Sequence, residues 1–151
     1  MLRFGRKRSR LSVITLADQA RDEGQWQRAA EYYRKALRRR PQNPPIWIQY
    51  GHVMKESGRC VEAESAYRRA IAYDPRNADA RLQLGRVLKL NGDKEGAQAS
   101  YLCAVALDPS LPDPLHELGT IGWQPAQLNH LEQLFKTDPP DPSDESETEM
   151  T

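Results

Sequence analysis

The sequence predicts an all-α solenoid built from helical hairpins that repeat every 34 residues. The main observation is a set of six columns in which one residue, or a pair of small ones, recurs at this spacing. They are Gly24/Gly58/Gly92, Pro41/Pro75/Pro109, Tyr33/Tyr67/Tyr101, Ala29/Ala63/Ala97, Ala36/Ala70/Ala104 and Ala17/Gly51/Gly85/Gly119. The second observation is that glycine occurs where each hairpin would turn, and proline where it would end. We expect three full units, a partial fourth and a closing helix.

The full units are residues 10–43, 44–77 and 78–111, and the second shows how each element is predicted. A first helix is expected over 44–57 and a second over 60–73, with Gly58 at the turn and Pro75 after the end. Asn43 and Asn77 precede first helices and can accept from their free N–H groups. Small residues such as Gly51 should let the helices approach closely, while Tyr67 fills the wider gaps.

The fourth unit, residues 112–136, departs from this pattern. Leu118 and Gly119 match a first helix, but Pro125 arrives early and Leu131 replaces the small alanine of the column. Residues 125–136 still form an apolar helical pattern, which predicts a helix that caps the stack.

These columns resemble the tetratricopeptide repeat family. The second unit supplies the family pattern of large, small and turn residues in order. They are Trp47, Tyr50, Gly51, Ala63, Tyr67, Ala70 and Pro75. The resemblance covers about residues 10–122 and implies an α-solenoid of tetratricopeptide repeats that acts as a protein–protein interaction scaffold. The family's pattern residues are structural, so they do not identify a ligand.

In this family the first helices line a concave groove that binds ligands. Six of the residues at the ligand-facing positions, all in the second and third units, are the candidate partner-binding residues. They are Gln49, His52, Lys55, Gln83, Arg86 and Lys89. The glutamines can donate to and accept from a peptide backbone, and Ile48 and Leu82 are expected to add apolar contact. The expected partner is therefore a protein or peptide segment that carries acidic groups.

Some co-chaperones of the family grip a C-terminal carboxylate with a clamp of Lys, Asn, Asn, Lys and Arg. The equivalent positions of this chain hold none of those residues. They hold Ile14, Asp18, Gln49, Asp79 and Gln83. A chaperone-tail ligand is therefore not expected.

The net charge of +1 conceals two oppositely charged ends. The arm of residues 1–9 is basic, and the tail of residues 137–151 is rich in Asp, Glu, Pro and Ser, which predicts disorder. The arm offers Phe4 as its only aromatic residue for base stacking, so nucleic acid is not the expected partner. Another hypothesis is that the tail folds back on the basic groove. Self-association through the stack ends or through Arg38, Arg39 and Arg40 is a further alternative.

No catalytic constellation is evident, and we expect neither an enzyme nor a cofactor or metal. No phosphate-binding glycine loop occurs, and His52 and His116 are too far apart in the repeats for one metal. Cys60 and Cys103 show no disulfide or metal spacing, and we expect both to be buried in helix packing in a cytoplasmic protein. No apolar run is long enough for a transmembrane segment.

A second resemblance concerns the style of the repeats. The runs Lys-Glu-Ser-Gly at 55–58 and Leu-Lys-Leu-Asn-Gly at 88–92 are similar to repeats that precede bacterial glycosyltransferase domains. This implies an alternative role as an accessory or regulatory module of an enzyme system of that kind.

Overall fold

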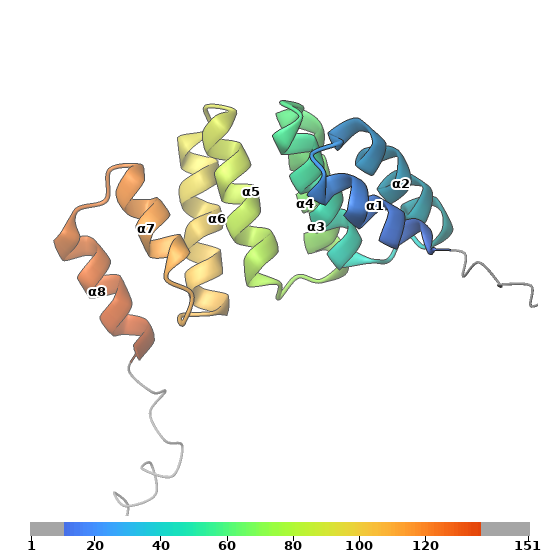
Figure 1. The fold of residues 1–151 in the computed structure, drawn as a ribbon. Coiled ribbons are helices and arrows are strands. Elements are labelled where there is room, and N and C mark those ends of the chain that lie inside the picture. Colours follow the sequence, from blue (N-terminus) through green and yellow to red (C-terminus); the bar gives the residue numbers. More distant parts are fainter. Residues whose placement is uncertain (1–10, 137–151) are drawn as a thin grey trace, which may run out of the picture. The chain divides into compact units, whose positions relative to one another are not determined.

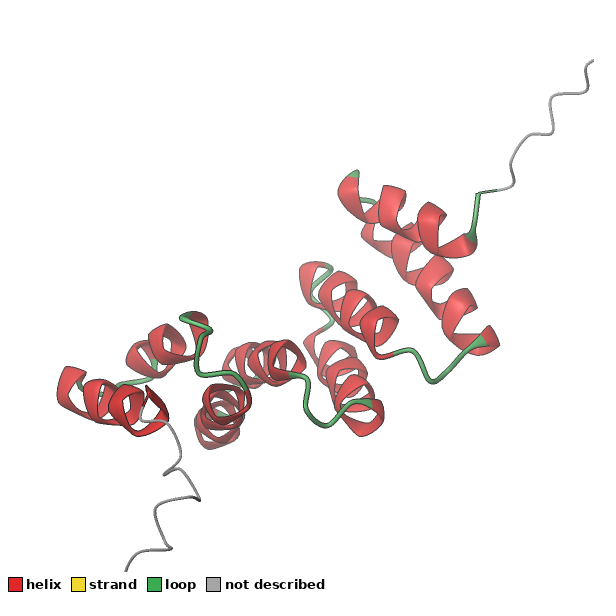
Figure 2. Ribbon diagram, turned by 90° about the horizontal axis from the view of Figure 1, so that it is seen from below, coloured by secondary structure: helices red, strands yellow, loops and turns green. Residues whose placement is uncertain are grey.

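The computed structural model describes residues 11–136, and within that range it contains eight α-helices and no strand (Figure 1). The helices are α1 (Val13–Asp22), α2 (Trp26–Arg39), α3 (Pro44–Glu56), α4 (Cys60–Tyr73), α5 (Ala78–Leu90), α6 (Lys94–Leu107), α7 (Asp113–Thr120) and α8 (Pro125–Lys136). Figure 2 shows short loops joining successive helices. The all-α prediction is confirmed. The basic arm and the acidic tail lie outside the described residues.

The chain divides into two compact units, which are described separately. Among the described residues, unit 1 comprises residues 11–76 with 90–92, and unit 2 comprises residues 77–89 with 93–136. In unit 1, α1 packs on α2, α2 on α3, and α3 on α4. In unit 2, α6 packs on α7 and α7 on α8.

The predicted turn glycines adopt the left-handed backbone conformation. Gly24, Gly58 and Gly92 have φ values of 71°, 78° and 83°. Other residues adopt this region at a steric cost, because their Cβ atom meets the backbone. The three glycines therefore reverse the chain between the first and second helices of each repeat.

The tyrosine column forms the centre of each hairpin. Tyr33, Tyr67 and Tyr101 are fully buried. A Cβ atom added to Gly51 would lie 2.6 Å from the ring of Tyr67, and one added to Gly85 would overlap the ring of Tyr101 in the same way. The glycine column is thus required by the tyrosine column, and removing one of these rings would cost about 3–5 kcal/mol.

The two predicted asparagine caps differ. The Asn77 Oδ1 atom accepts from the Ala80 N–H at 2.9 Å, as expected. The prediction is wrong for Asn43, whose side chain makes no capping bond. Pro44 and Pro45 have no N–H group to be capped, and the Ile46 N–H already donates to the Asn43 backbone carbonyl at 3.1 Å.

Two other expectations need adjustment. Cys60 is half-buried and Cys103 is exposed, so the prediction that both are buried is wrong. Cys60 begins α4, and Cys103 follows the buried Tyr101 by two positions, which turns it toward solvent on a helix. Helix α8 has the predicted bounds, but Leu134 and Phe135 remain exposed on it.

Candidate functional site

The six residues predicted to bind a partner all lie on first helices of repeats. They divide evenly between the units: Gln49, His52 and Lys55 on α3 of unit 1, and Gln83, Arg86 and Lys89 on α5 of unit 2. Within each trio the spacing is three residues, which places the side chains along one side of the helix.

In unit 1, Gln49 is tied to α1 by an arginine. The Arg21 Nη1 atom donates to the Gln49 Oε1 at 2.8 Å, to the Asp18 Oδ1 at 3.2 Å and to the Tyr33 hydroxyl at 3.1 Å. The Tyr33 hydroxyl in turn donates to Asp18 at 2.6 Å. Only the carbonyl oxygen of Gln49 is used, and its Nε2 donors have no bond among the described residues.

The electrostatics of this network follow from its partners. Burial raises the pKa of the Tyr33 hydroxyl, and the hydrogen bond to Asp18 raises it further. For Arg21, burial acts to lower the pKa, but the bond to Asp22 and the charge of Asp18 outweigh it, so the net shift is upward. Arg21 is therefore a fixed cation whose charge is offset by two carboxylates.

His52 and Lys55 occupy the next two turns of α3. The His52 Nδ1 atom and the Tyr67 hydroxyl are 3.1 Å apart, and the two rings meet edge to face with centroids 5.8 Å apart. The Lys55 ammonium lies 4.0 Å from the Glu56 carboxylate, at the limit of an ion pair, and its side chain is 21% exposed. Lys55 is thus a weakly paired cation.

In unit 2, Gln83 differs from Gln49 because it is buried, with only 7% of its surface exposed. Its Nε2 atom donates to the Asp79 Oδ1 at 3.1 Å. Its Oε1 atom is buried without a hydrogen-bond partner among the described residues. A buried acceptor without a partner lowers the stability of the fold by its desolvation penalty, and a hydrogen bond from a donor would remove that penalty.

Arg86 and Lys89 are both engaged with α7. The Arg86 Nε atom donates to the Glu117 Oε1 at 2.8 Å, and its Nη2 atom donates to the Asp113 Oδ2 at 2.9 Å. The Lys89 ammonium donates to the Glu117 Oε2 at 2.5 Å and to the Thr120 hydroxyl at 3.2 Å. The positive charge predicted for this part of the face is therefore largely neutralised within unit 2.

Glu117 is the centre of this cluster. Its residue surface is 8% exposed, and the Tyr101 hydroxyl also donates to it at 3.3 Å. Burial acts to raise the pKa of the Glu117 carboxyl, but hydrogen bonds from Lys89 and Arg86 outweigh burial and bring the pKa below its usual value. The pKa of Tyr101 is raised by burial and by the adjacent Glu117 charge.

The spacing of the sequence predicts two of these hydrogen bonds between repeats, although the residue types taken one by one do not. Arg21 and Gln49 are 28 residues apart, and so are Lys89 and Glu117. Each bond joins the twelfth position of one repeat to the sixth position of the next, so a search for donor and acceptor pairs between columns would have found both.

The apolar part of the predicted face is not available to a ligand. Ile48 is 7% exposed and Leu82 is 4% exposed. Both belong to the buried apolar core, because apolar residues on a helix face are buried whenever a neighbouring helix covers them. The expectation that they add ligand contact is wrong.

The described residues show no cluster of three or more His, Cys, Asp or Glu side chains placed to hold a metal ion. Among the helices of residues 11–136, none has the length and apolarity needed to cross a membrane.

Several solved structures have the same fold. The second TPR domain of human RPAP3, in complex with the HSP70 peptide SGPTIEEVD, has a TM-score of 0.71 and 20% identity, covering 75% of this chain and 94% of that one. The Sgt2 TPR domain from Aspergillus fumigatus has a TM-score of 0.69 and 20% identity, covering 85% and 83%. The Yersinia enterocolitica type III secretion chaperone SycD, in complex with a peptide of the translocator YopD, has a TM-score of 0.64 and 15% identity, covering 82% and 89%.

No curated protein matches the sequence. The family model described as the Cilia and flagella-associated protein 70 middle TPR-like domain matches residues 13–149, which is most of the chain. The tetratricopeptide interpretation of the 34-residue columns is thereby confirmed, and the chain belongs to the family of Cilia and flagella-associated protein 70 middle TPR-like domains.

Proposed function

We propose that the chain is a protein-interaction module whose first helices bind a peptide or protein segment. The candidate binding residues are Gln49, His52 and Lys55 on α3 of unit 1 and, taken separately, Gln83, Arg86 and Lys89 on α5 of unit 2. The observation that carries the proposal is that α3 presents two hydrogen-bond donors with spare capacity, namely the Gln49 amide nitrogen and the weakly paired Lys55 ammonium, at the sixth and twelfth positions of one repeat. Solved structures of the same fold contain bound peptides, which supports this kind of ligand.

The two trios have different parts in this proposal. Lys55 favours acidic groups on the partner, because a weakly paired cation gains from a carboxylate. Arg86 and Lys89 already bond to Glu117 and Asp113. A partner carboxylate would have to compete with Glu117 and Asp113 for these cations. We therefore expect unit 2 to contribute van der Waals and neutral hydrogen-bond contacts rather than charge attraction.

The test is a matched pair of charge reversals within unit 1. A partner is first captured with the full chain and identified by cross-linking and mass spectrometry, and its affinity is then measured by calorimetry. Lys55→Glu should weaken binding about tenfold, since it removes one attraction and adds one repulsion. Arg68→Glu, which reverses an exposed charge on the second helix α4, should leave the affinity unchanged. Equal affinities for both variants would rule out the α3 surface as the site.

The reversal of Arg86 and Lys89 is a poor test of binding, because new carboxylates there would face Glu117 and Asp113. The peptide SGPTIEEVD is a better second probe. The carboxylate clamp positions of this chain hold Ile14, Asp18, Gln49, Asp79 and Gln83. We therefore expect no binding of that peptide by fluorescence polarisation.

An accessory or regulatory role in an enzyme system such as a bacterial glycosyltransferase is the alternative. It rests on the resemblance of residues 55–58 and 88–92 to repeats of such systems. The same cross-linking experiment distinguishes the two, because capture of a transferase as the main partner would favour the accessory role.

A further inference from the structure

A cavity of about 270 Å³ opens in unit 1 where α1 begins and α2 ends. Its lining combines apolar and cationic side chains and contains no acidic residue. The lining residues are Ser12, Val13, Ile14, Ala36, Arg39, Arg40 and Asn43. Small-molecule pockets usually measure about 300–1,000 Å³, so this space is suited to a few side chains of a peptide rather than to a cofactor.

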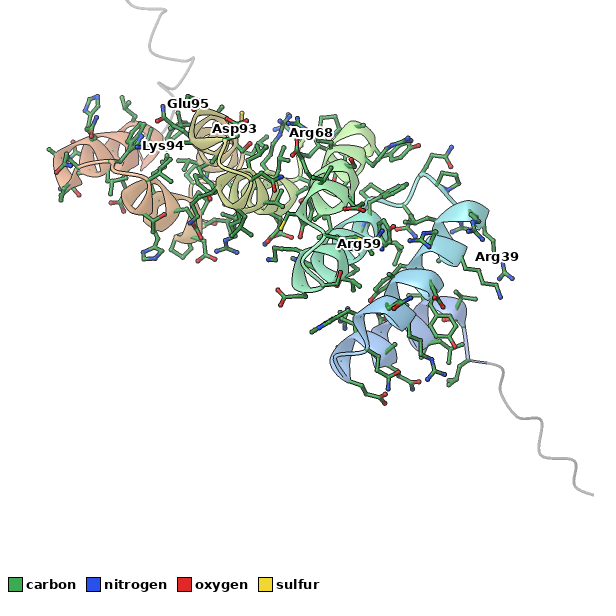
Figure 3. All side chains as sticks on the ribbon, turned by 90° about the horizontal axis from the view of Figure 1, so that it is seen from above. Arg39, Arg59, Arg68, Asp93, Lys94 and Glu95 are labelled. Carbon is green, nitrogen blue, oxygen red and sulfur yellow. The ribbon has the colours of Figure 1, made fainter. Side chains whose placement is uncertain are left out.

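The arginines at this end of α2 are available for a ligand. Arg38, Arg39 and Arg40 are consecutive and exposed. None of their guanidinium groups has a hydrogen bond or ion pair with another described residue, unlike Arg21 in the same unit. Figure 3 shows the Arg39 side chain projecting from the ribbon of α2. Guanidinium groups bind carboxylates in a bidentate manner, so three unpaired ones form a strong attraction for acidic groups.

The apolar side of the cavity is also unusual for this repeat. Ala36 is half-buried and lines the cavity, whereas Ala70 and Ala104 in the same column are fully buried. Val13 and Ile14 are half-buried there, and the neighbouring Leu11 is 51% exposed. The first repeat thus leaves open an apolar contact area beside its arginines.

We propose that this cavity, with Arg38, Arg39 and Arg40, is a second binding site that takes an acidic peptide segment containing one aliphatic anchor side chain. The anchor occupies the space between Ile14 and Ala36, and carboxylates on either side of it pair with Arg39 and Arg40. The argument for this partner is charge complementarity together with the mixed lining. The site shares no residue with the proposed α3 surface, so either can fail without the other.

The probe is a labelled peptide in which one leucine is flanked on each side by two glutamates. Nitrogen-15 spectra of the full chain, recorded during titration with this peptide, should shift first at residues 12–14 and 38–43. Replacing the leucine by serine, or the glutamates by glutamines, should each abolish the shifts. Raising the salt should weaken binding, because exposed charges are screened over about 10 Å at 0.1 M salt.

A pair of charge-matched variants tests the residues. Arg39→Gln with Arg40→Gln should weaken the peptide about tenfold, since each exposed guanidinium contributes a factor of a few. Arg59→Gln with Arg68→Gln removes two exposed charges at the start of and on α4, away from the cavity lining, and should change the affinity little. Equal affinities of the two variants, or shifts spread over all cationic residues, would overturn the proposal.

Two other occupants are distinguished by the same reagents. If the full chain shows no titration but a chain shortened to residues 1–136 does, the acidic segment that occupies the site is the chain's own tail, which supports the site and its chemistry. If vesicles containing phosphatidylserine cause the same shifts and the glutamate peptide causes none, the surface binds membranes, and the peptide proposal is wrong.

Discussion

The two units build the same bond between neighbouring repeats from different charges. In unit 1, the Arg21 guanidinium donates to the neutral amide of Gln49 at 2.8 Å. In unit 2, the Lys89 ammonium donates to the carboxylate of Glu117 at 2.5 Å. Both bonds span 28 residues, so the scaffold geometry is shared while the electrostatics differ.

The consequence is that the units use their cations differently. Glu117 accepts hydrogen bonds from Arg86, Lys89 and Tyr101, so these two cations of α5 are paired within unit 2. Unit 1 balances Arg21 with Asp18 and Asp22 but leaves Lys55 weakly paired and Arg38, Arg39 and Arg40 unpaired among the described residues. In a repeat scaffold, cations can therefore form stabilising ion pairs in one unit and remain available to a ligand in another.

The largest effect is expected from removing the acceptor of this bond in each unit. Glu117→Ala should lower the free energy of unfolding of unit 2 by about 2–3 kcal/mol, because Arg86 and Lys89 lose a partly buried partner. Gln49→Ala should cost unit 1 about 1 kcal/mol, the typical contribution of one hydrogen bond. Urea unfolding, with amide exchange to assign each loss to a unit, measures both. Similar decreases in the free energy of unfolding of the two units would show that the charge of Glu117 does not make its bond stronger than that of Gln49.

A smaller and pH-dependent difference should follow from the carboxyl of Glu117. Its pKa is lower in the folded chain than in the unfolded one, so the unfolded chain takes up the proton first as the pH falls. The associated stabilisation is complete above the unfolded value of about 4.3 and is lost as the pH falls through the folded value.

Glu117→Gln removes this contribution, so the stability difference between wild type and variant should shrink on acidification from about pH 6 to pH 3. The free energy of unfolding at each pH provides the measurement, and Gln49→Ala serves as the control with a pH-independent difference. A constant difference for Glu117→Gln would contradict the assigned role of the ion pairs.

The repeat architecture could be predicted from the sequence because each column has a local steric cause. Gly58 must adopt a positive φ, and Gly51 must make room for Tyr67. Such requirements depend on backbone geometry and volume, which recur with the period. The start of α4 at Cys60 and its end at Tyr73 were therefore predictable to the residue.

The candidate site was less predictable because its properties depend on partners in other repeats. Arg86 and Lys89 were correctly placed on a first helix, but their charge is cancelled by Glu117, a residue of the next repeat. Likewise, Ile48 and Leu82 share a helix with the site residues, and only packing shows that they are buried. Residue types at single repeat positions are enough to predict the scaffold. The charge and exposure of the candidate site depend on which residues of different repeats pair with each other.

The smallest effect concerns the caps that begin first helices in the two units. Asn77→Ala should destabilise unit 2 by about 1 kcal/mol, the usual cost of losing a side-chain cap, because its Oδ1 atom accepts from the Ala80 N–H at 2.9 Å. Asn43→Ala should change the stability of unit 1 by less than about 0.5 kcal/mol, since Pro44 and Pro45 leave few donors to cap. Urea unfolding of the two variants under one set of conditions compares them directly. A loss for Asn43→Ala as large as that for Asn77→Ala would mean that the prolines do not replace the cap, and that the two units begin their first helices by the same interaction.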